Sequence, residues 1–520
     1  MKKIIYAFLC TGLLSLTACD SFLEEDSKAK LTADSYLKTE LQATSQVNRM
    51  YWHGAPRHIS KASSAYVGPR ASLDAMLTGY FVNSYEGQEI TCMYSRLLTR
   101  QQNVSTVSGM MNEIWDDCFN AINSANGAIK YIPGISMSSA SAAKLMGEAK
   151  FFRAFNYYYY LVKTFGAVPM PVEPYESLEN LFLERTPVDQ IYTLIESDLK
   201  DAVDNLPATK FADNGKRITK YAAAMLLTNV YLKQGKYAEA AQYAKVVVDS
   251  PHSLTQNGDL GMSSAYNKLR STDDLDEVIY AQEYNESIQT GDWWPTYAFS
   301  SQAVALFGTY SIFERIYGPT DQFLNVYEES DLRVQPNQFF HWEYTHPESG
   351  LVWKSEQAGC WYYYDENALL NTGRATKDWN FFRYAEALLA AAEAIAQSSG
   401  VTAEAAGYLA QIKARANMNG KTVAQFTTEL QALSKDAFVK ECLTERLREF
   451  PLEFKIWDDC TRTGLFPVIS KNQKGKVEYV SLVGASNASG AVFKESDLLW
   501  PISIDELQRN PNLTQNPGYN

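Results

Sequence analysis

Hydrophobic residues recur at helical spacing along much of this 520-residue chain. Between residues 113 and 131 the apolar side chains lie three to five positions apart, and Pro133-Gly134 ends the run. That spacing places them on one face of a helix. A second helix is predicted over 142–165, before Gly166, and a third over 187–206, after a threonine N-cap. Amphipathic helices joined by short turns favour antiparallel packing.

The most regular pattern covers residues 221–251. Small and aromatic residues there stand close to the spacing of a tetratricopeptide repeat, at Leu227, Tyr231, Gly235, Tyr237, Ala240 and Pro251. One such unit cannot bury its own apolar face, so neighbouring helices must complete it. The expected neighbours are 113–165, 187–206 and a later pair at 381–396 and 402–417. The sequence therefore predicts a mainly α fold, a tetratricopeptide-like α-superhelix.

Helical periodicity weakens between residues 255 and 378. Turn formers such as Asn257-Gly258 and Gly318-Pro319 interrupt the pattern, and five of the ten tryptophans lie in this segment. A long aromatic-rich insertion is where a scaffold commonly carries its binding surface. We expect a helical scaffold over 31–254 and 379–464, a large irregular, loop-rich insertion over 255–378 with minor β-hairpins, and an irregular C-terminal segment over 465–520.

The N-terminus has the layout of a secretory leader. Lys2-Lys3 precedes an uncharged apolar run, and Leu16-Thr17-Ala18-Cys19 closes it. The alternatives are a buried helix or a membrane span, but the run is shorter than the roughly 18–20 residues that cross a bilayer. We predict a signal peptide over 1–18, acylation of Cys19 as in a bacterial lipobox, and a lipidated tether over 19–30.

Charge and cysteine content exclude several classes of partner. Loss of Lys2 and Lys3 with the leader changes the formal net charge from −13 to −15. A chain this acidic is a poor partner for nucleic acid or anionic lipid, so membrane attachment depends on the acyl anchor. Beyond Cys10 and Cys19, five cysteines remain without CxxC spacing. This argues against a disulfide framework and against a zinc site.

Motifs for catalysis are missing from the sequence. The five histidines form no HExxH pattern, and there is no GxSxG, Walker or GxGxxG motif. Acidic doublets such as Asp116-Asp117 point about 100° apart on a helix and cannot flank one glycosidic bond. We expect no enzyme activity and no cofactor, although Asp and Asn residues in 255–378 leave a structural calcium site open.

Several segments, taken in order, resemble the SusD/RagB family of outer-membrane nutrient-binding lipoproteins. The start after the lipobox, Cys19-Asp20-Ser21-Phe22-Leu23, is similar to the start of family members. The other similar segments are residues 147–155 with Phe165-Gly166-Ala167-Val168-Pro169, Arg383-Tyr384-Ala385-Glu386-Ala387-Leu388-Leu389, Glu445-Arg446-Leu447-Arg448-Glu449-Phe450, Leu499-Trp500-Pro501-Ile502-Ser503, and the closing residues 510–519.

The resemblance implies a single SusD-like domain over 31–520 and a cell-surface lipoprotein of the outer membrane. It also implies a partner, a SusC-like TonB-dependent transporter over which the lipoprotein closes as a lid. Charged residues within the matching helices, such as Arg153, Arg383 and Glu386, lie beside apolar faces, where a buried charge must be paired. We therefore expect these charges to hold the fold together and not to contact ligand.

Sugar rings have apolar faces edged by hydroxyl groups, so a glycan binder needs aromatic platforms and a few polar side chains. The family resemblance directs attention to residues 66–100 for the polar contributors. Our candidate ligand residues are the platforms Trp293, Trp294, Tyr297, Trp342, Trp353 and Trp361, with Asn83, Tyr85, Arg70 and Asp74 beside them. The alternative is that many of these aromatics fill a core beneath the loops.

The sequence thus predicts a non-catalytic protein that binds a glycan or oligosaccharide at the cell surface and delivers it to the transporter. Two alternatives remain open. One is capture of peptides, as in the RagB branch of the family, and the other is a surface glycosidase.

Overall fold

The computed structural model describes most of the chain after the predicted tether, namely residues 36–51, 75–83, 98, 104–176, 181–288, 291, 293–298, 307 and 317–519. The predicted signal peptide, Cys19 and the tether lie outside these residues. So do three of the predicted polar contributors, Arg70, Asp74 and Tyr85. The predictions for these positions stay predictions.

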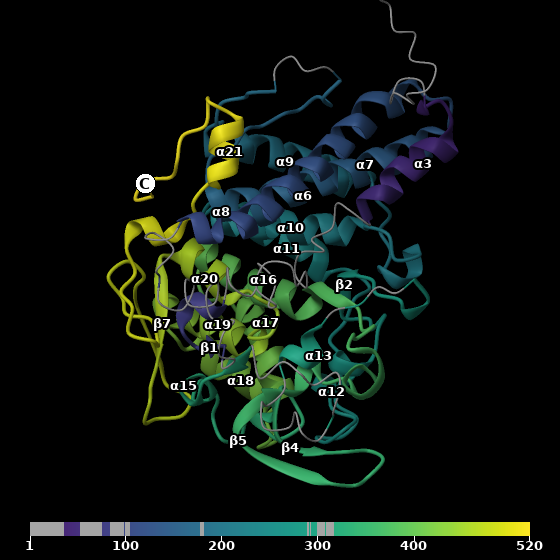
Figure 1. The fold of residues 1–520 in the computed structure, drawn as a ribbon. Coiled ribbons are helices and arrows are strands. Elements are labelled where there is room, and N and C mark those ends of the chain that lie inside the picture. Colours follow the sequence, from purple (N-terminus) through teal and green to yellow (C-terminus); the bar gives the residue numbers. More distant parts are fainter. Residues whose placement is uncertain are drawn as a thin grey trace, which may run out of the picture.

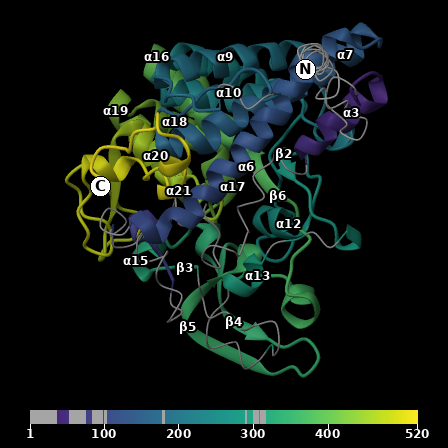
Figure 2. The ribbon, with the colours of Figure 1, turned by 45° about the horizontal axis from the view of Figure 1, so that its top comes forward.

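Helices dominate the described chain, and they form one layer after another (Figures 1 and 2). In chain order, α6, α7, α9, α10, α11, α16, α17 and α18 each pack against the next. The N-terminal group is α3 (Glu40–Arg49), α6 (Val104–Tyr131), α7 (Ser139–Phe155), α8 (Lys163–Phe165), α9 (Val188–Asn205), α10 (Lys220–Lys233) and α11 (Tyr237–Val248). The second group is α16 (Tyr384–Ser399), α17 (Ala403–Ala416), α18 (Val423–Gln431), α19 (Lys435–Glu449) and α20 (Ile456–Thr463).

Short elements connect and flank these two groups. The short helices are α12 (Ala265–Ser271), α13 (Trp294–Tyr297), α15 (Asp321–Leu324) and α21 (Ile504–Arg509). The described strands form four two-stranded antiparallel sheets. They pair β1 (Phe81–Val82) with β3 (Gly318–Pro319), β2 (Val278–Gln282) with β6 (Trp379–Arg383), β4 (Phe340–Thr345) with β5 (Val352–Cys360), and β7 (Leu465–Ile469) with β8 (Val477–Ser481).

The helices predicted from hydrophobic spacing are confirmed, with shifted ends. Helix α6 begins nine residues before the predicted start at 113. The predicted helix 142–165 corresponds to α7, a π-helical stretch over Asn156–Val162, and α8. It ends at Gly166, where φ is +71°, a value that glycine adopts without strain.

The expected helix start at 381 is wrong. Residues Trp379–Arg383 form strand β6, and α16 begins only at Tyr384. All five residues of β6 are buried, so the strand lacks the alternation of polar and apolar residues that would distinguish it from a buried helix. Its partner β2 lies about a hundred positions earlier in the chain, beyond the reach of local pattern.

Aromatic residues of α7 and the π-helical stretch form the centre of the core. The rings of Phe155 and Tyr159 stack with centroids 4.9 Å apart, and Phe151 meets Tyr280 of β2 edge-on at 5.7 Å. Tyr280 in turn stacks on Phe381 of β6 at 5.3 Å. These contacts fix the β2–β6 sheet against the N-terminal helices, and this sheet borders the cavity described below.

The charged residues of the recognised segments are paired and buried, as predicted. Arg383 contacts Glu453 at 2.6 Å and Glu449 at 3.2 Å, and it also contacts Glu277 of the segment before β2. Arg153 pairs with Asp198 at 2.7 Å. These ion pairs join helices and strands that are distant in sequence, so they hold the fold together. Within the described chain, no helix combines the length and apolar character needed to cross a membrane.

Candidate functional site

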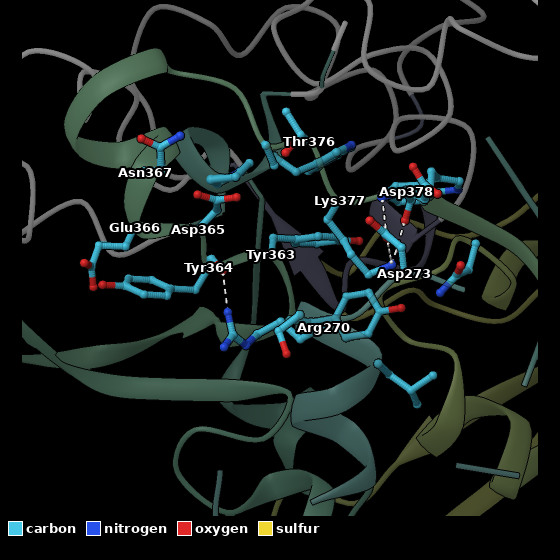
Figure 3. A pocket seen from close by; sticks show the side chains of 18 of the residues that line it. Arg270, Asp273, Tyr363, Tyr364, Asp365, Glu366, Asn367, Thr376, Lys377 and Asp378 are labelled. Atoms are coloured by element: carbon cyan, nitrogen blue, oxygen red, sulfur yellow. Dashed lines mark hydrogen bonds and ion pairs between the residues drawn. The ribbon is translucent and has the colours of Figure 1, made fainter. Parts of the chain in front are cut away.

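A cavity of about 450 Å³ opens beside the end of α12. Three segments enclose it: the end of α12 with the following turn, residues 362–367, and residues 375–380 leading into β6 (Figure 3). The principal lining side chains are Arg270, Asp273, Trp294, Tyr363, Tyr364, Asp365, Glu366, Asn367, Thr376, Lys377, Asp378, Trp379 and Asn380. Its volume is in the range of known small-ligand sites, roughly 300–1,000 Å³.

A stacked aromatic pair reaches one end of the cavity through Tyr364, while its other member, Trp361, lies behind Tyr364 and is not a lining residue. The rings of Trp361 and Tyr364 are 4.4 Å apart and inclined by only 12°. The Arg270 guanidinium lies 4.8 Å from the Trp361 ring centre and donates to the Tyr364 carbonyl at 2.8 Å. Trp361 donates its indole N–H to Asn267 of α12 at 2.8 Å. The pair is therefore held in a fixed orientation before any ligand arrives.

Buried aromatic rings support the cavity from beneath. Trp294 stacks on Tyr363 at 5.2 Å, and Tyr363 stacks on Trp379 at 6.0 Å. Trp379 in turn stacks on Phe454 at 5.3 Å. A close-packed floor of this kind resists collapse when a ligand binds or leaves.

Carboxylates and amides edge the cavity at both ends. Figure 3 shows Asp365, Glu366 and Asn367 near Tyr364, and Asp273, Lys377 and Asp378 at the opposite end. Glu366 and Asn367 are exposed. At the opposite end, Asp273 accepts from the Lys377 ammonium at 2.9 Å and from the Asp378 backbone N–H at 3.0 Å.

Burial shifts the pKa of several lining groups. The pKa of Asp378 is raised to about 6, chiefly by burial and further by Asp273, although the Tyr284 N–H and Lys216 oppose the shift. Burial also raises the pKa of Tyr364 to about 12. The pKa of Arg270 is lowered by burial, an effect that Asp365 counteracts. Near neutral pH, Asp378 is mostly ionised and Tyr364 keeps its proton.

Three of the predicted platforms are at or beside this cavity. Trp361 forms half of the stacked pair, and Trp294 lies in the floor with only 1% of its surface exposed. Trp293 is half-buried beneath the Arg374 guanidinium, 5.0 Å from its ring centre, next to the lining segment that begins at residue 375. Tyr297 is buried, as the alternative of a core role anticipated.

The remaining described candidates lie elsewhere. Trp342 and Trp353 belong to the β4–β5 hairpin, where Trp342 is half-buried and Trp353 is 39% exposed. Asn83 is buried at the end of β1. None of these three lines the cavity. Their role in ligand contact stays a prediction.

The sequence predictions did not include Tyr364, Arg270 or the acidic lining residues Asp273, Asp365, Glu366 and Asp378. A local signal existed for Tyr364, because Trp361-Tyr362-Tyr363-Tyr364 is followed directly by Asp365-Glu366-Asn367, which joins ring faces to hydrogen-bonding groups. No local signal marks Arg270 or Asp378, which only the folded chain brings together.

The arrangement suits a ligand with flat apolar faces and many hydroxyl groups. Aromatic rings stack on the apolar faces, and carboxylate or amide oxygens accept hydrogen bonds from hydroxyls. Among the described residues, no group of three or more His, Cys, Asp or Glu side chains is placed to hold a metal ion. The four described cysteines, Cys118, Cys360, Cys442 and Cys460, are buried free thiols.

Comparison with protein families gives two matches on this chain. Residues 362–519 match the model described as the SusD family. Residues 22–232 match the model described as "Starch-binding associating with outer membrane". The first match includes the stacked pair's Tyr364 and the segment at residues 375–380.

Individual proteins are similar over nearly the whole chain. SusD-like protein P2 of Formosa agariphila is 26% identical over 538 residues and is covered completely, as is this chain. A SusD superfamily protein from Parabacteroides distasonis superposes with a TM-score of 0.79 at 25% identity, over 94% of this chain and all of the other. Surface glycan-binding protein A from Bacteroides thetaiotaomicron, solved with laminarihexaose, shares the fold with a TM-score of 0.69 at 16% identity, over 93% of this chain and all of the other.

Proposed function

The chain belongs to the SusD family, and from this membership we propose that it binds an oligosaccharide at the cell surface and passes it to a SusC-like TonB-dependent transporter. One of the matching family models is described as starch-binding and associated with the outer membrane, and the solved relatives include surface glycan-binding proteins, which are not catalysts. The glycan that this chain binds and the residues that contact it are part of what we propose.

The observation that carries the proposal is the stacked pair Trp361 and Tyr364 at the edge of the cavity. Tyr364, held by Trp361 and Arg270, presents a fixed ring to a sugar, and the exposed Glu366 and Asn367 beside it can accept and donate hydrogen bonds. Preorganised platforms of this kind reduce the conformational entropy lost on binding.

Delivery to a transporter requires the protein to stay at the membrane. The lipobox-like Leu16-Thr17-Ala18-Cys19 supports an acyl anchor on Cys19, and residues 19–30 then form the tether. In this scheme the folded domain moves on its tether as a lid over the transporter. We also infer that α10 and α11 form a tetratricopeptide-like unit that α9 and α16 extend into a superhelix, since these helices pack in that order.

Calorimetric titration against a panel of polysaccharides tests the proposal. We expect the wild-type protein to bind at least one glycan, and Tyr364→Ala to weaken that binding at least about fivefold, because loss of a stacking ring costs roughly 1 kcal/mol or more. Tyr175→Ala, at a partly exposed tyrosine outside the cavity, serves as the control and should bind normally.

One further variant and two outcomes decide the location and the ligand class. Loss of binding in Trp353→Ala with normal binding in Tyr364→Ala would place the ligand on the β4–β5 hairpin and not in the cavity. Binding to no glycan, together with heterogeneous peptides co-purifying with the transporter, would favour peptide capture. Release of sugar products by the purified protein would contradict the proposal.

A further inference from the structure

A second cavity, of about 640 Å³, adjoins the first. The two cavities share three lining residues, Asp273, Thr376 and Asp378. Figure 3 shows Asp273 and Asp378 at one end of the first cavity, away from Tyr364 and Asn367, with Thr376 between the two ends. We call these three residues the ridge, because they border the space on both sides.

The second cavity repeats the chemistry of the first. It is lined by the half-buried Tyr284 and by the amides of Asn48, Gln282 and Asn285. The backbone N–H of Tyr284 donates to the ridge carboxylate of Asp378 at 2.9 Å, which holds this tyrosine beside the ridge. The second cavity therefore has its own aromatic ring and several amides on the far side of the ridge.

Each cavity also contains a buried carbonyl oxygen that lacks a hydrogen-bond partner among the described residues. In the second cavity it is the side-chain oxygen of Gln282, a residue only 7% exposed. In the first it is the side-chain oxygen of Asn380, a residue 6% exposed. Leaving a buried acceptor unpaired is costly, so both positions favour a ligand that donates hydrogen bonds, as hydroxyl groups do.

Two of the three cations that line the two cavities form ion pairs with neighbouring carboxylates. Lys216 is 3.1 Å from both Asp378 and Glu283, and 3.3 Å from Asp274. Lys377 is paired with Asp273 at 2.9 Å. The third cation, Arg270, forms no ion pair with a described residue, and its Nε has no hydrogen-bond partner among them. Its guanidinium contacts the Trp361 ring and the Tyr364 carbonyl, and the charge of Asp365 lies close by.

Unpaired negative charge remains on the cavity surface. Glu286 in the second cavity and Glu366 in the first are exposed, and neither has a cationic partner among the described residues. Like charges without compensation repel, so uronic acid or sulfate groups are disfavoured in this space.

We propose that the two cavities form one groove, and that its ligand is an uncharged glycan chain that crosses the ridge and contacts Tyr364 on one side and Tyr284 on the other. This inference rests on the proposed function and adds the class and minimum extent of the ligand. Glycan hydroxyls satisfy Asn380 and Gln282, while the carboxylates of the ridge accept hydrogen bonds from the units that cross it.

The test begins with affinity electrophoresis of the wild-type protein in gels containing laminarin, starch or galactomannan, and in matched gels containing alginate, polygalacturonate or chondroitin sulfate. We expect retardation by at least one neutral polymer and by none of the anionic ones. Oligosaccharides of the retarding polymer, from the disaccharide upward, are then titrated calorimetrically. Affinity should rise with chain length until the ligand spans both cavities.

Tyr284→Ala separates the second cavity from the first. We expect this variant to bind short oligosaccharides normally and to lose about tenfold in affinity for long ones, the effect of removing one stacking ring. Tyr284→Phe keeps the ring and should retain most of the increase in affinity with oligosaccharide length. Tyr364→Ala should weaken binding at every length. Thermal melting of each variant checks that it is folded.

The outcomes distinguish this inference from the proposed function. Binding of a neutral glycan with no dependence on chain length, or with equal affinity in Tyr284→Ala, overturns the single groove and leaves glycan capture intact. Retardation by anionic polymers alone overturns the assignment of an uncharged ligand. Binding to no glycan of either kind overturns the proposed function itself.

Discussion

Arg270 controls the candidate site through two contacts made by one planar group. Its guanidinium lies over the Trp361 ring at 4.8 Å and donates to the Tyr364 carbonyl at 2.8 Å, so it orients both members of the stacked pair. A lysine carries the same charge but lacks the planar fork that can stack and donate at once. The geometry of this guanidinium therefore matters more than its charge.

We predict that Arg270→Lys weakens glycan binding several-fold, because loss of a partly buried cation–π contact costs about 1 kcal/mol. Calorimetric titration measures the affinity, and the melting temperature should fall only slightly. Arg374→Lys is a matched control, since the Arg374 guanidinium lies 5.0 Å from the Trp293 ring centre but does not line the cavity. Equal affinity of wild type and Arg270→Lys would show that the stacked pair needs no such support.

At the scale of secondary structure, one buried arginine joins four segments of the chain. Arg383 ends β6 and contacts Glu449 in α19, Glu453 after it, and Glu277 before β2. Arg415 of α17 contacts the same Glu277 at 2.7 Å. These charges lie out of water, so each depends on its partners for compensation.

We predict that Arg383→Met destabilises the protein by roughly 3–5 kcal/mol, because it leaves buried carboxylates without their main cation. Urea unfolding followed by circular dichroism measures the change. Lys474→Met removes a surface ion pair with Glu329 whose side chains are both exposed, and it should cost less than about 1 kcal/mol. A similar loss in both variants would mean that the buried cluster contributes no more than an exposed pair.

Elements with a local signature could be predicted from the sequence, and elements made by distant pairing could not. Helix α9 could be recognised from its apolar stripe, although its N-cap is Pro187 and not the predicted threonine, and no side chain caps it. Helix α10 could be recognised from its apolar content and its Thr219 cap, since it is buried nearly all round. Strand β6 was missed because its five residues are all buried and its partner lies far away in the chain. Hydrophobic periodicity reports which face is buried, not which segment covers it.

The same limit applies to the candidate site. Trp361 could be singled out as an aromatic in the loop-rich segment, but Trp294 and Tyr297 share that local character and are buried. Arg270 and Asp378 are more than a hundred positions apart, and only the contact between the turn after α12 and the segment before β6, where Asp273 accepts from the Asp378 N–H, places them in one cavity. Residue type can identify candidate platforms, whereas exposure depends on tertiary packing.

Across the whole molecule, buried carboxylates with lowered pKa couple folding to pH. Arg333, Lys413 and Arg448 surround Glu445 and lower its pKa to about 2, although burial alone would raise it. Neighbouring arginines likewise lower the pKa of Glu277 and of Asp459. Groups with a lowered folded pKa stabilise the protein above the unfolded pKa, and this stabilisation is lost as the pH falls toward the folded value. Asp378, with a pKa raised to about 6, acts in the opposite sense as the pH falls through 6. Burial also raises the pKa of Asp198, Glu453 and Glu506, so these carboxylates oppose part of the effect.

We predict that the free energy of unfolding falls steeply as the pH drops from about 4.5 toward 2, where Glu445 and the other carboxylates with lowered pKa become protonated. Glu445→Gln should be less stable than wild type by roughly 3 kcal/mol at neutral pH, and this difference should shrink toward pH 2, because both side chains are then neutral. Urea unfolding at a series of pH values measures both effects. Glu343→Gln, at an exposed carboxylate 3.0 Å from the exposed Lys354, is the control and should follow the wild-type curve closely. A difference between Glu445→Gln and wild type that stays constant with pH would mean that the variant acts through packing and not through the charge of Glu445.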